Sequence, residues 1–272
     1  MIEKEHIHVR VPCGFFVSAA VTAFLGLLER LNSEPKCPYR FTTGLLGNYK
    51  PADYARNVIV EAFLEDASAS RLWFIDSDMI PAPNSPQLLW HKKYDIVAAP
   101  YPFWGRRNAE WEPDASWGIY DFSDDRRSFK QKSPLDEGLV HNDAAGTGMM
   151  IISRRVLEDP RMIVENRSYQ KMDRSVVSLK PSDARPFFQN GYKANGAFEW
   201  TEDLEFCYRA RNLDYSVVVD HGVKCGHIKQ VDVLHVMDFA VRSYQKGWND
   251  YEKMAEQAGH SIVRPLAGQM VA

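Results

Sequence analysis

Two aspartates separated by one residue, Asp76 and Asp78, directly follow the wholly apolar segment Leu72–Ile75. If that segment is a buried strand whose extended conformation continues, both carboxylates point to the same side. They then emerge at the carboxyl end of the strand, the edge at which open α/β sheets bind ligands. Two close carboxylates repel each other, and a hard divalent cation such as Mg²⁺ or Mn²⁺ relieves that repulsion. The alternative is a pair of ordinary turn residues; the position after an apolar strand favours a cation site.

A second pair of acids, Glu202 and Asp203, opens the predicted helix Glu202–Leu213. The helix macrodipole favours acids there and Thr201 is a suitable N-cap, which explains the pair without catalysis. In the functional alternative, one of the two carboxylates is a general base that removes a proton from an acceptor hydroxyl.

Two further residues are candidates because of their chemistry. His227 follows a predicted strand and a glycine, where a neutral imidazole can complete a coordination shell, although a lone histidine is more often structural. Arg56 lies in the predicted helix Pro51–Asp66 and could bind a diphosphate bidentately. On sequence alone, a solvent-facing arginine is the interpretation that we favour for Arg56.

The elements that must position these residues alternate in type. Short apolar strands separated by helices predict an α/β fold with a mostly parallel sheet covered on both faces. Predicted strands are 7–12, 39–45, 72–75, 94–99, 149–153 and 216–220; predicted helices are 16–31, 51–66, 85–91, 154–158 and 202–213. Residues 101–140 suggest antiparallel strands or a long loop, residues 160–198 are loop-like, and residues 231–259 suggest one or two helices.

Bulk properties exclude several classes of protein. The chain has 272 residues and a formal net charge of −3, which is ordinary for a globular protein and excludes a coiled coil or a disordered tail. Four cysteines form no C-x-x-C pair, so we expect reduced thiols. The apolar stretch 15–28 is shorter than the about 20 residues that a membrane span needs. We therefore expect a cytoplasmic protein without a membrane span.

Five segments occur in a particular order: FIDSDM, YDIVAAPYP, GTGMMIISRRVLED, WTEDLEFCYRARNLDYSVVVD and CGHI. Together they resemble a nucleotide-sugar glycosyltransferase with the GT-A fold, of the D-x-D containing, family-2-like kind. The resemblance covers about residues 7–228. It implies a single Rossmann-like GT-A domain over 1–230, with a nucleotide-sugar-binding half (1–100) and an acceptor-binding half (101–230). A helical C-terminal extension would follow at 231–272.

The resemblance also implies a role for individual residues. Asp78 would bind the metal directly, with Asp76 beside the metal or the ribose, and His227 would match the late metal-binding histidine. Asp203 would match the catalytic base of inverting members, with Glu202 beside it. The segment WTED departs from the commoner GED form, which leaves inversion or retention open. The residues implied near the donor are Arg56 for the nucleotide and Gly146, Thr147 and Gly148 for the sugar.

The implied activity is transfer of a sugar from a nucleoside diphosphate sugar, with a UDP-sugar favoured, to an acceptor hydroxyl with the help of Mn²⁺ or Mg²⁺. Residues 160–198 contain seven basic and three acidic residues, a net charge of +4. This basic segment suggests a polyanionic acceptor such as DNA with a hydroxylated base. A saccharide or other small acceptor is the alternative, and an ordinary solvated loop explains the charges equally well. Less favoured alternatives are a haloacid-dehalogenase-like phosphatase and a non-catalytic module that binds sugar nucleotides.

Overall fold

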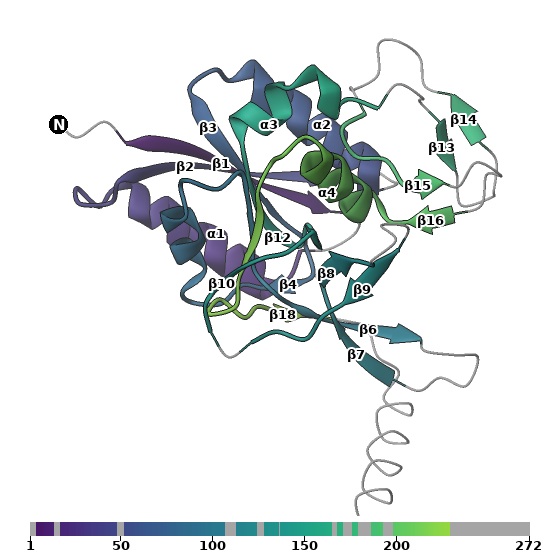
Figure 1. Cartoon of the computed structure of the whole chain (residues 1–272). Coiled ribbons are helices and arrows are strands. Elements are labelled where there is room, and N and C mark those ends of the chain that lie inside the picture. Colours follow the sequence, from purple (N-terminus) through teal and green to yellow (C-terminus); the bar gives the residue numbers. More distant parts are fainter. Residues whose placement is uncertain are drawn as a thin grey trace, which may run out of the picture. The chain divides into compact units, whose positions relative to one another are not determined.

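The computed structural model shows a central sheet with helices packed on it (Figure 1). It describes residues 4–13, 17–47, 52–106, 113–123, 128–135, 137–164, 168–170, 176–178, 186–192 and 198–228. The helices predicted over 231–259 lie outside these residues, and so does most of the basic segment. In the described part of the chain, no helix is both long and apolar enough to cross a membrane.

The chain divides into two compact units. The first consists of Met1–Trp104 and Ala115–Ile228, and the second of Gly105–Asp114 and Lys229–Ala272. The sheet and all the helices described below belong to the first unit. The described part of the second unit is limited to the ends of two short strands that pair with each other, β6 (Pro102–Arg106) and β7 (Pro113–Trp117).

The central sheet has seven strands in the order β10-β17-β5-β12-β3-β1-β2. Strands β2, β1 and β3 are parallel, and so are β5 and β17, whereas β12 runs antiparallel between β3 and β5. Edge strand β10 is also antiparallel to its neighbour. The prediction of an α/β fold with a mostly parallel central sheet is confirmed. The bounds are β1 Glu5–Cys13, β2 Tyr39–Gly47, β3 Ala69–Ile75, β5 Ile96–Ala98, β10 Leu139–His141, β12 Met149–Ser153 and β17 Val217–Asp220.

Helices cover both faces of the sheet. Successive side chains of a strand point to opposite faces, so each buried strand contributes apolar side chains to both. On β3, Leu72 and Phe74 pack with α2 (Ala52–Glu65), α3 (Arg154–Glu158) and α4 (Glu202–Asn212). Trp73 and Ile75 point to the other face and pack with α1 (Ala19–Asn32) and the 3-10 helix η1 (Ser85–Trp90). Figure 1 shows α1 on the side of the sheet opposite α2 and α3. Both faces are therefore apolar, and polar groups gather at the strand ends.

Helix α1 begins three residues later than predicted. The Ser18 hydroxyl accepts a hydrogen bond from the Val21 N–H at 3.0 Å and donates one to the Met79 carbonyl at 2.8 Å. A serine that satisfies a free N–H group of the first turn is a typical N-cap, so the helix starts at Ala19.

The smaller sheets lie in the segments for which the sequence indicated no regular helix. Segment 101–140 was expected to form antiparallel strands or a long loop, and it contains antiparallel strands. The bounds are β4 Met79–Ile80, β8 Ile119–Phe122, β9 Phe129–Gln131, β11 Ala144–Ala145, β13 Ser168–Gln170, β14 Val176–Ser178, β15 Gly191–Tyr192, β16 Phe198–Trp200, β18 Gly226–His227 and η2 Pro160–Met162. Strand β18 pairs with β4, which brings the CGHI segment to the turn after β3.

Candidate functional site

The turn after β3 separates the two aspartates. Strand β3 ends at Ile75, and the Met79 N–H donates to the Asp76 carbonyl at 3.1 Å, which closes a turn. The extended conformation therefore does not continue, so the condition under which both carboxylates were expected to point to the same side is not met. Asp76 faces Arg56, and Asp78 faces His227. Asp78 still raises the pKa of Asp76, after the larger effect of burial, so the two charges remain coupled.

Arg56 is buried at the centre of the site, and its side chain is only 6% exposed. Its Nη2 donates to both oxygens of Asp76, at 3.1 and 3.2 Å, and its Nη1 donates to Oε1 of Glu202. Burial acts to lower the pKa of Arg56, but Asp76, Glu202 and Asp203 together raise it. The interpretation of Arg56 as a solvent-facing residue is therefore wrong. One guanidinium joins the turn after β3 to the start of α4.

The first turn of α4 carries both candidate general bases, and their surroundings differ. Burial, followed by the negative charge of Asp203, raises the pKa of Glu202 to about 7 although Arg56 opposes the shift. Oδ1 of Asp203 accepts from the Leu204 N–H at 2.9 Å and from the Thr201 hydroxyl. Thr201 occupies the predicted N-cap position. Glu202 is thus bound by the guanidinium of Arg56, and Asp203 is bound by groups at the start of its own helix.

His227 and Asp78 form the other side of the site. Nδ1 of His227 lies 3.1 Å from the Pro102 carbonyl oxygen. That oxygen can only accept a hydrogen bond, so Nδ1 is the donor and carries a proton. Nε2 lies 2.9 Å from Oδ2 of Asp78. In a neutral imidazole, Nε2 then carries a lone pair that faces the carboxylate. These two groups repel each other unless a proton or a cation lies between them. A histidine whose second nitrogen donates to a backbone carbonyl is also the usual arrangement of a metal ligand.

The Gly146–Thr147–Gly148 turn lies beside Asp76. The Asp76 N–H donates to the Gly148 carbonyl at 3.0 Å, because β12 leaves this turn to pair with β3. Thr147 is fully buried, and its Oγ1 has no hydrogen-bond partner among the described residues. The turn implied to border the sugar is therefore next to the aspartates.

Sequence reasoning missed two residues of this site. Tyr101, from the YDIVAAPYP segment, is 8% exposed, and its charge interactions reach Asp76 and Asp203. Asp53 is 3% exposed and adds to the negative charge that raises the pKa of Glu202. A helical stripe could have revealed Asp53: it shares a buried face of α2 with Arg56, Val60 and Phe63.

Burial raises the pKa of Asp53 to about 6, although the Tyr54 N–H and Arg56 act against the shift. Because the folded-state pKa exceeds the unfolded value of 3.8, ionising Asp53 costs stability as the pH rises through about 6. We expect Asp53→Asn to raise the free energy of unfolding by about 1–3 kcal/mol at pH 8, since a shift of one unit corresponds to about 1.4 kcal/mol. Urea unfolding at pH 8 and below pH 4 measures the gain, which should vanish at the lower pH.

Glu65→Gln, at the exposed end of the same helix, is the matched control and should change stability at neither pH. An equal gain from Asp53→Asn at both pH values would show that the effect does not come from the ionised carboxyl.

One tight group of metal-ligating side chains occurs elsewhere in the described chain. The ligand atoms of His6, His8 and Asp66 lie within 4.8 Å of one another. They lie near the amino ends of β1 and β3, whereas Asp76 and Asp78 follow the carboxyl end of β3. Arg40 donates to Nδ1 of His6 at 2.8 Å, and Arg10 lies 3.2 Å from Nδ1 of His8. Two guanidinium groups disfavour a cation at this place. We therefore interpret the group as a structural network that ties β1 to the loop before β3.

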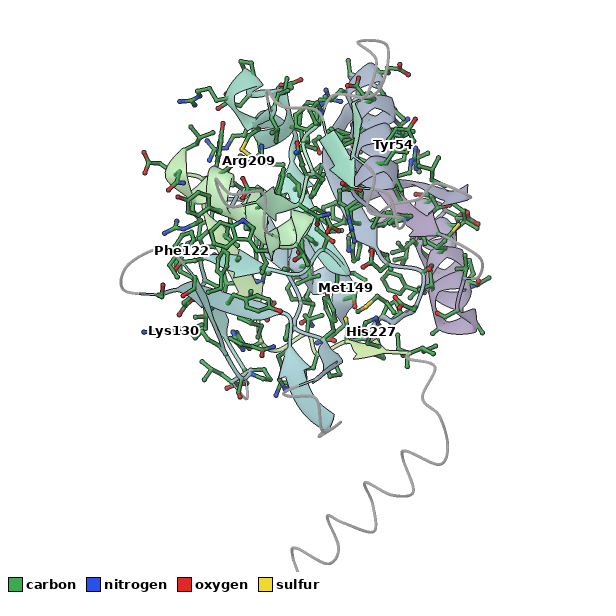
Figure 2. The ribbon with its side chains drawn as sticks, turned by 90° about the vertical axis from the view of Figure 1, so that its right-hand side faces the viewer. Tyr54, Phe122, Lys130, Met149, Arg209 and His227 are labelled. Atoms are coloured by element: carbon green, nitrogen blue, oxygen red, sulfur yellow. The ribbon has the colours of Figure 1, made fainter. Side chains whose placement is uncertain are left out.

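Aromatic rings lie beside α4, where they contact its Tyr208. Trp200 contacts Phe129 and Tyr208, with ring centroids 5.2 and 5.5 Å away. Phe122 stacks on Phe129 at 4.9 Å and meets Tyr208 edge to face; Figure 2 shows Phe122 beside α4. These rings lie next to the helix that carries Glu202 and Asp203.

No family model matches the chain, and no curated protein matches its sequence. The crystal structure of A197 from STIV is similar at 16% sequence identity, over 83% of this chain and 86% of that one, with a TM-score of 0.49. GalNAc-T7, solved with UDP, GalNAc and Mn²⁺, is 10% identical over 85% of this chain and 45% of that one, with a TM-score of 0.42. Apo-UDP-glucose pyrophosphorylase is 12% identical over 89% and 82%, with a TM-score of 0.36. Likenesses at this identity and TM-score do not establish an activity for the chain.

Proposed function

We propose that the chain transfers a sugar from a nucleoside diphosphate sugar, with UDP-sugars favoured, to an acceptor hydroxyl. The observation that carries the proposal is the meeting of two different acidic pairs around Arg56. Asp76 and Asp78 lie on the sheet side, and Glu202 and Asp203 lie on the helix side. Four carboxylates and one buried guanidinium leave an excess of negative charge, which suits a cation-bound diphosphate better than a free one.

The cation would be held by Asp78 and His227, with Asp76 close by. When bound, it would neutralise the charge that develops on the departing diphosphate. A nitrogen ligand among carboxylates suits Mn²⁺ better than Mg²⁺, which strongly prefers oxygen ligands. The hydrogen bond from Nδ1 of His227 to Pro102 supports this role, because it leaves Nε2 as the coordinating atom.

The acceptor proton would be removed by the Glu202–Asp203 pair. A general base works best when its pKa lies near the working pH, and the pKa of Glu202 is about 7. Asp203 is the base that the family resemblance implies. A direct displacement by a base-activated hydroxyl inverts the configuration at the anomeric carbon of the sugar. The aromatic rings beside α4 suit an acceptor with flat apolar faces, and both a saccharide and a nucleobase have such faces.

The DNA acceptor stays a prediction. Of the seven basic residues in 160–198, the structure describes Arg161, which pairs with Asp159 at 2.6 Å. Binding of hydroxymethylated and plain DNA at two salt concentrations tests the idea, because phosphate contacts weaken steeply with salt. Binding that is absent, or that does not change with salt, would leave the saccharide acceptor as the preferred class.

A thermal-shift screen of the full chain tests the donor. The probes are UDP-, GDP- and dTDP-sugars, each with and without Mn²⁺. At about 100 times the dissociation constant, a ligand adds about 2.7 kcal/mol of stability, and we expect one nucleotide to do so only with Mn²⁺. Asp78→Asn should abolish the Mn²⁺-dependent part of the shift.

No shift with any donor would overturn the proposed function. A shift without sugar transfer would favour a non-catalytic module. Release of phosphate from a generic aryl phosphate would favour the phosphatase.

A further inference from the structure

The backbone around Tyr101 is bonded to Gly118 and to the CGHI segment. Its carbonyl accepts from the Gly118 N–H at 3.2 Å. The residues on either side hold the CGHI segment: the Pro100 carbonyl accepts from the Cys225 N–H at 3.0 Å, and the Pro102 carbonyl lies 3.1 Å from Nδ1 of His227. Any shift of Tyr101 therefore shifts the groups that orient His227.

Three glycines make room for the Tyr101 ring. A side-chain carbon on Gly146 would lie 2.0 Å from the Tyr101 hydroxyl oxygen. On Gly148 it would lie 2.8 Å from Cζ, and on Gly118 it would lie 3.3 Å from the same atom. Contacts below 3.0 Å force something to move, so Gly146 and Gly148 are required by this ring rather than by their own backbone conformation.

The ring and the hydroxyl of Tyr101 contact different parts of the site. The ring meets the His227 imidazole edge to face, with centroids 5.5 Å apart. The hydroxyl oxygen accepts from the Gly148 N–H at 3.3 Å. Burial, together with Asp76 and Asp203, raises the pKa of Tyr101 well above its usual value, so the phenol stays protonated and neutral. A neutral side chain can lie among these carboxylates without adding to their repulsion.

We infer that Tyr101 is a positioning residue that holds His227 and the Gly146–Gly148 turn in a fixed relation to each other. In terms of the proposed function, on which this inference rests, it sets the place of the cation relative to the donor sugar. Tyr101 acts through His227 and Gly148 and needs no contact with the reacting atoms. Residues that orient a metal-bound histidine typically change metal affinity when they are replaced.

Calorimetric titration of the full chain with Mn²⁺ tests the inference without any assay of activity. Tyr101→Leu removes the ring from His227 and should lower Mn²⁺ affinity about 10-fold to 100-fold. Tyr101→Phe keeps the ring and should give a smaller loss. Tyr39→Leu is the matched control: Tyr39 is also buried, and its hydroxyl donates to the Leu89 carbonyl at 3.1 Å, away from the site. It should lower the melting temperature and leave Mn²⁺ affinity unchanged.

A compensation experiment tests the glycine contacts. Gly146→Ala should destabilise the protein because its new methyl group meets the hydroxyl of Tyr101. Adding Tyr101→Phe removes that oxygen but leaves the ring carbon Cζ 2.9 Å from the new methyl group, so the double variant should regain part of the lost melting temperature and Mn²⁺ affinity. Gly148→Ala meets ring carbons instead, and Tyr101→Phe should not rescue it.

The outcomes separate the inference from the proposed function. If Tyr101→Leu is less stable but binds Mn²⁺ as tightly as the unaltered protein, Tyr101 is merely structural and the inference alone fails. If Tyr101→Phe restores none of the stability that Gly146→Ala loses, that result would also count against it. If the unaltered protein binds no Mn²⁺, the cation role in the proposed function is overturned, and the inference falls with it.

Discussion

Replacing Arg56 with methionine is expected to lower the free energy of unfolding by about 3–5 kcal/mol at pH 7, because it leaves buried carboxylates without their cation. Arg56 is the partner of both Asp76 and Glu202, and methionine fills a similar volume without a charge. Urea unfolding, monitored by circular dichroism, measures the loss.

The loss should depend on pH in a defined direction. The folded-state pKa of Glu202, about 7, lies above the unfolded value of 4.5, and Arg56 is the group that opposes a further rise. A raised carboxyl pKa contributes stability that is present below the unfolded pKa and is lost as the pH rises through the folded pKa. The variant should therefore be most impaired at pH 8 and approach the unaltered protein below pH 4.5.

Two controls accompany Arg56→Met. Adding Asp76→Asn and Glu202→Gln removes the unpaired charges, so the triple variant should regain most of the lost stability. Glu158→Gln breaks the exposed pair with Arg154 and should cost well under about 1 kcal/mol. An Arg56→Met protein as stable as the original at pH 8 would contradict the central role given to this arginine.

The second large effect concerns the acids of α4. Glu202→Gln and Asp203→Asn are expected to slow sugar transfer, with a loss of about 10²-fold to 10⁴-fold for the residue that removes the acceptor proton. Both variants should keep Mn²⁺-dependent donor binding, since the cation ligands are unchanged. Single-turnover transfer rates across about pH 5 to 9 separate the two roles.

If Glu202 is the base, the rate in the unaltered protein rises with pH through about 7, as its carboxyl loses a proton, and Glu202→Gln removes that rise. If Asp203 is the base, Asp203→Asn causes the large loss and Glu202→Gln leaves a rate that no longer depends on pH near 7. Full transfer in both variants would remove the pair from the mechanism.

Most strands of the sheet could be predicted because buried strands are short runs of apolar residues. Leu72–Ile75 and Met149–Ser153 are short apolar runs and are found as β3 and β12. Their direction could not be predicted, since an apolar run is the same for a parallel and an antiparallel neighbour. The turn at Asp76–Met79 was given only as the less favoured alternative for the two aspartates, and the pairing of β4 with β18, which follows that turn, could not be predicted because it joins segments far apart in the chain.

The acids of the candidate site could be named from the sequence, but the residues that pack around them could not. Asp76, Asp78, Glu202 and Asp203 could be singled out because the first pair directly follows an apolar strand and the second opens a predicted helix. Tyr101 could not, since an aromatic residue between two prolines has no chemical signature of its own. Its importance comes from glycines that follow more than forty residues later in the chain.

The reversed strand β12 has a consequence for synthesis of the protein. Strands β3 and β5 are made early, yet they are not neighbours in the sheet, and the strand that joins them begins at Met149. Strand β17, the other neighbour of β5, comes later still, at Val217. Unpaired strand edges are sites of aggregation, and pairing between distant segments is slow. A chain stalled on the ribosome near residue 140 therefore carries open edges on both strands, and the sheet closes only after most of the protein has emerged.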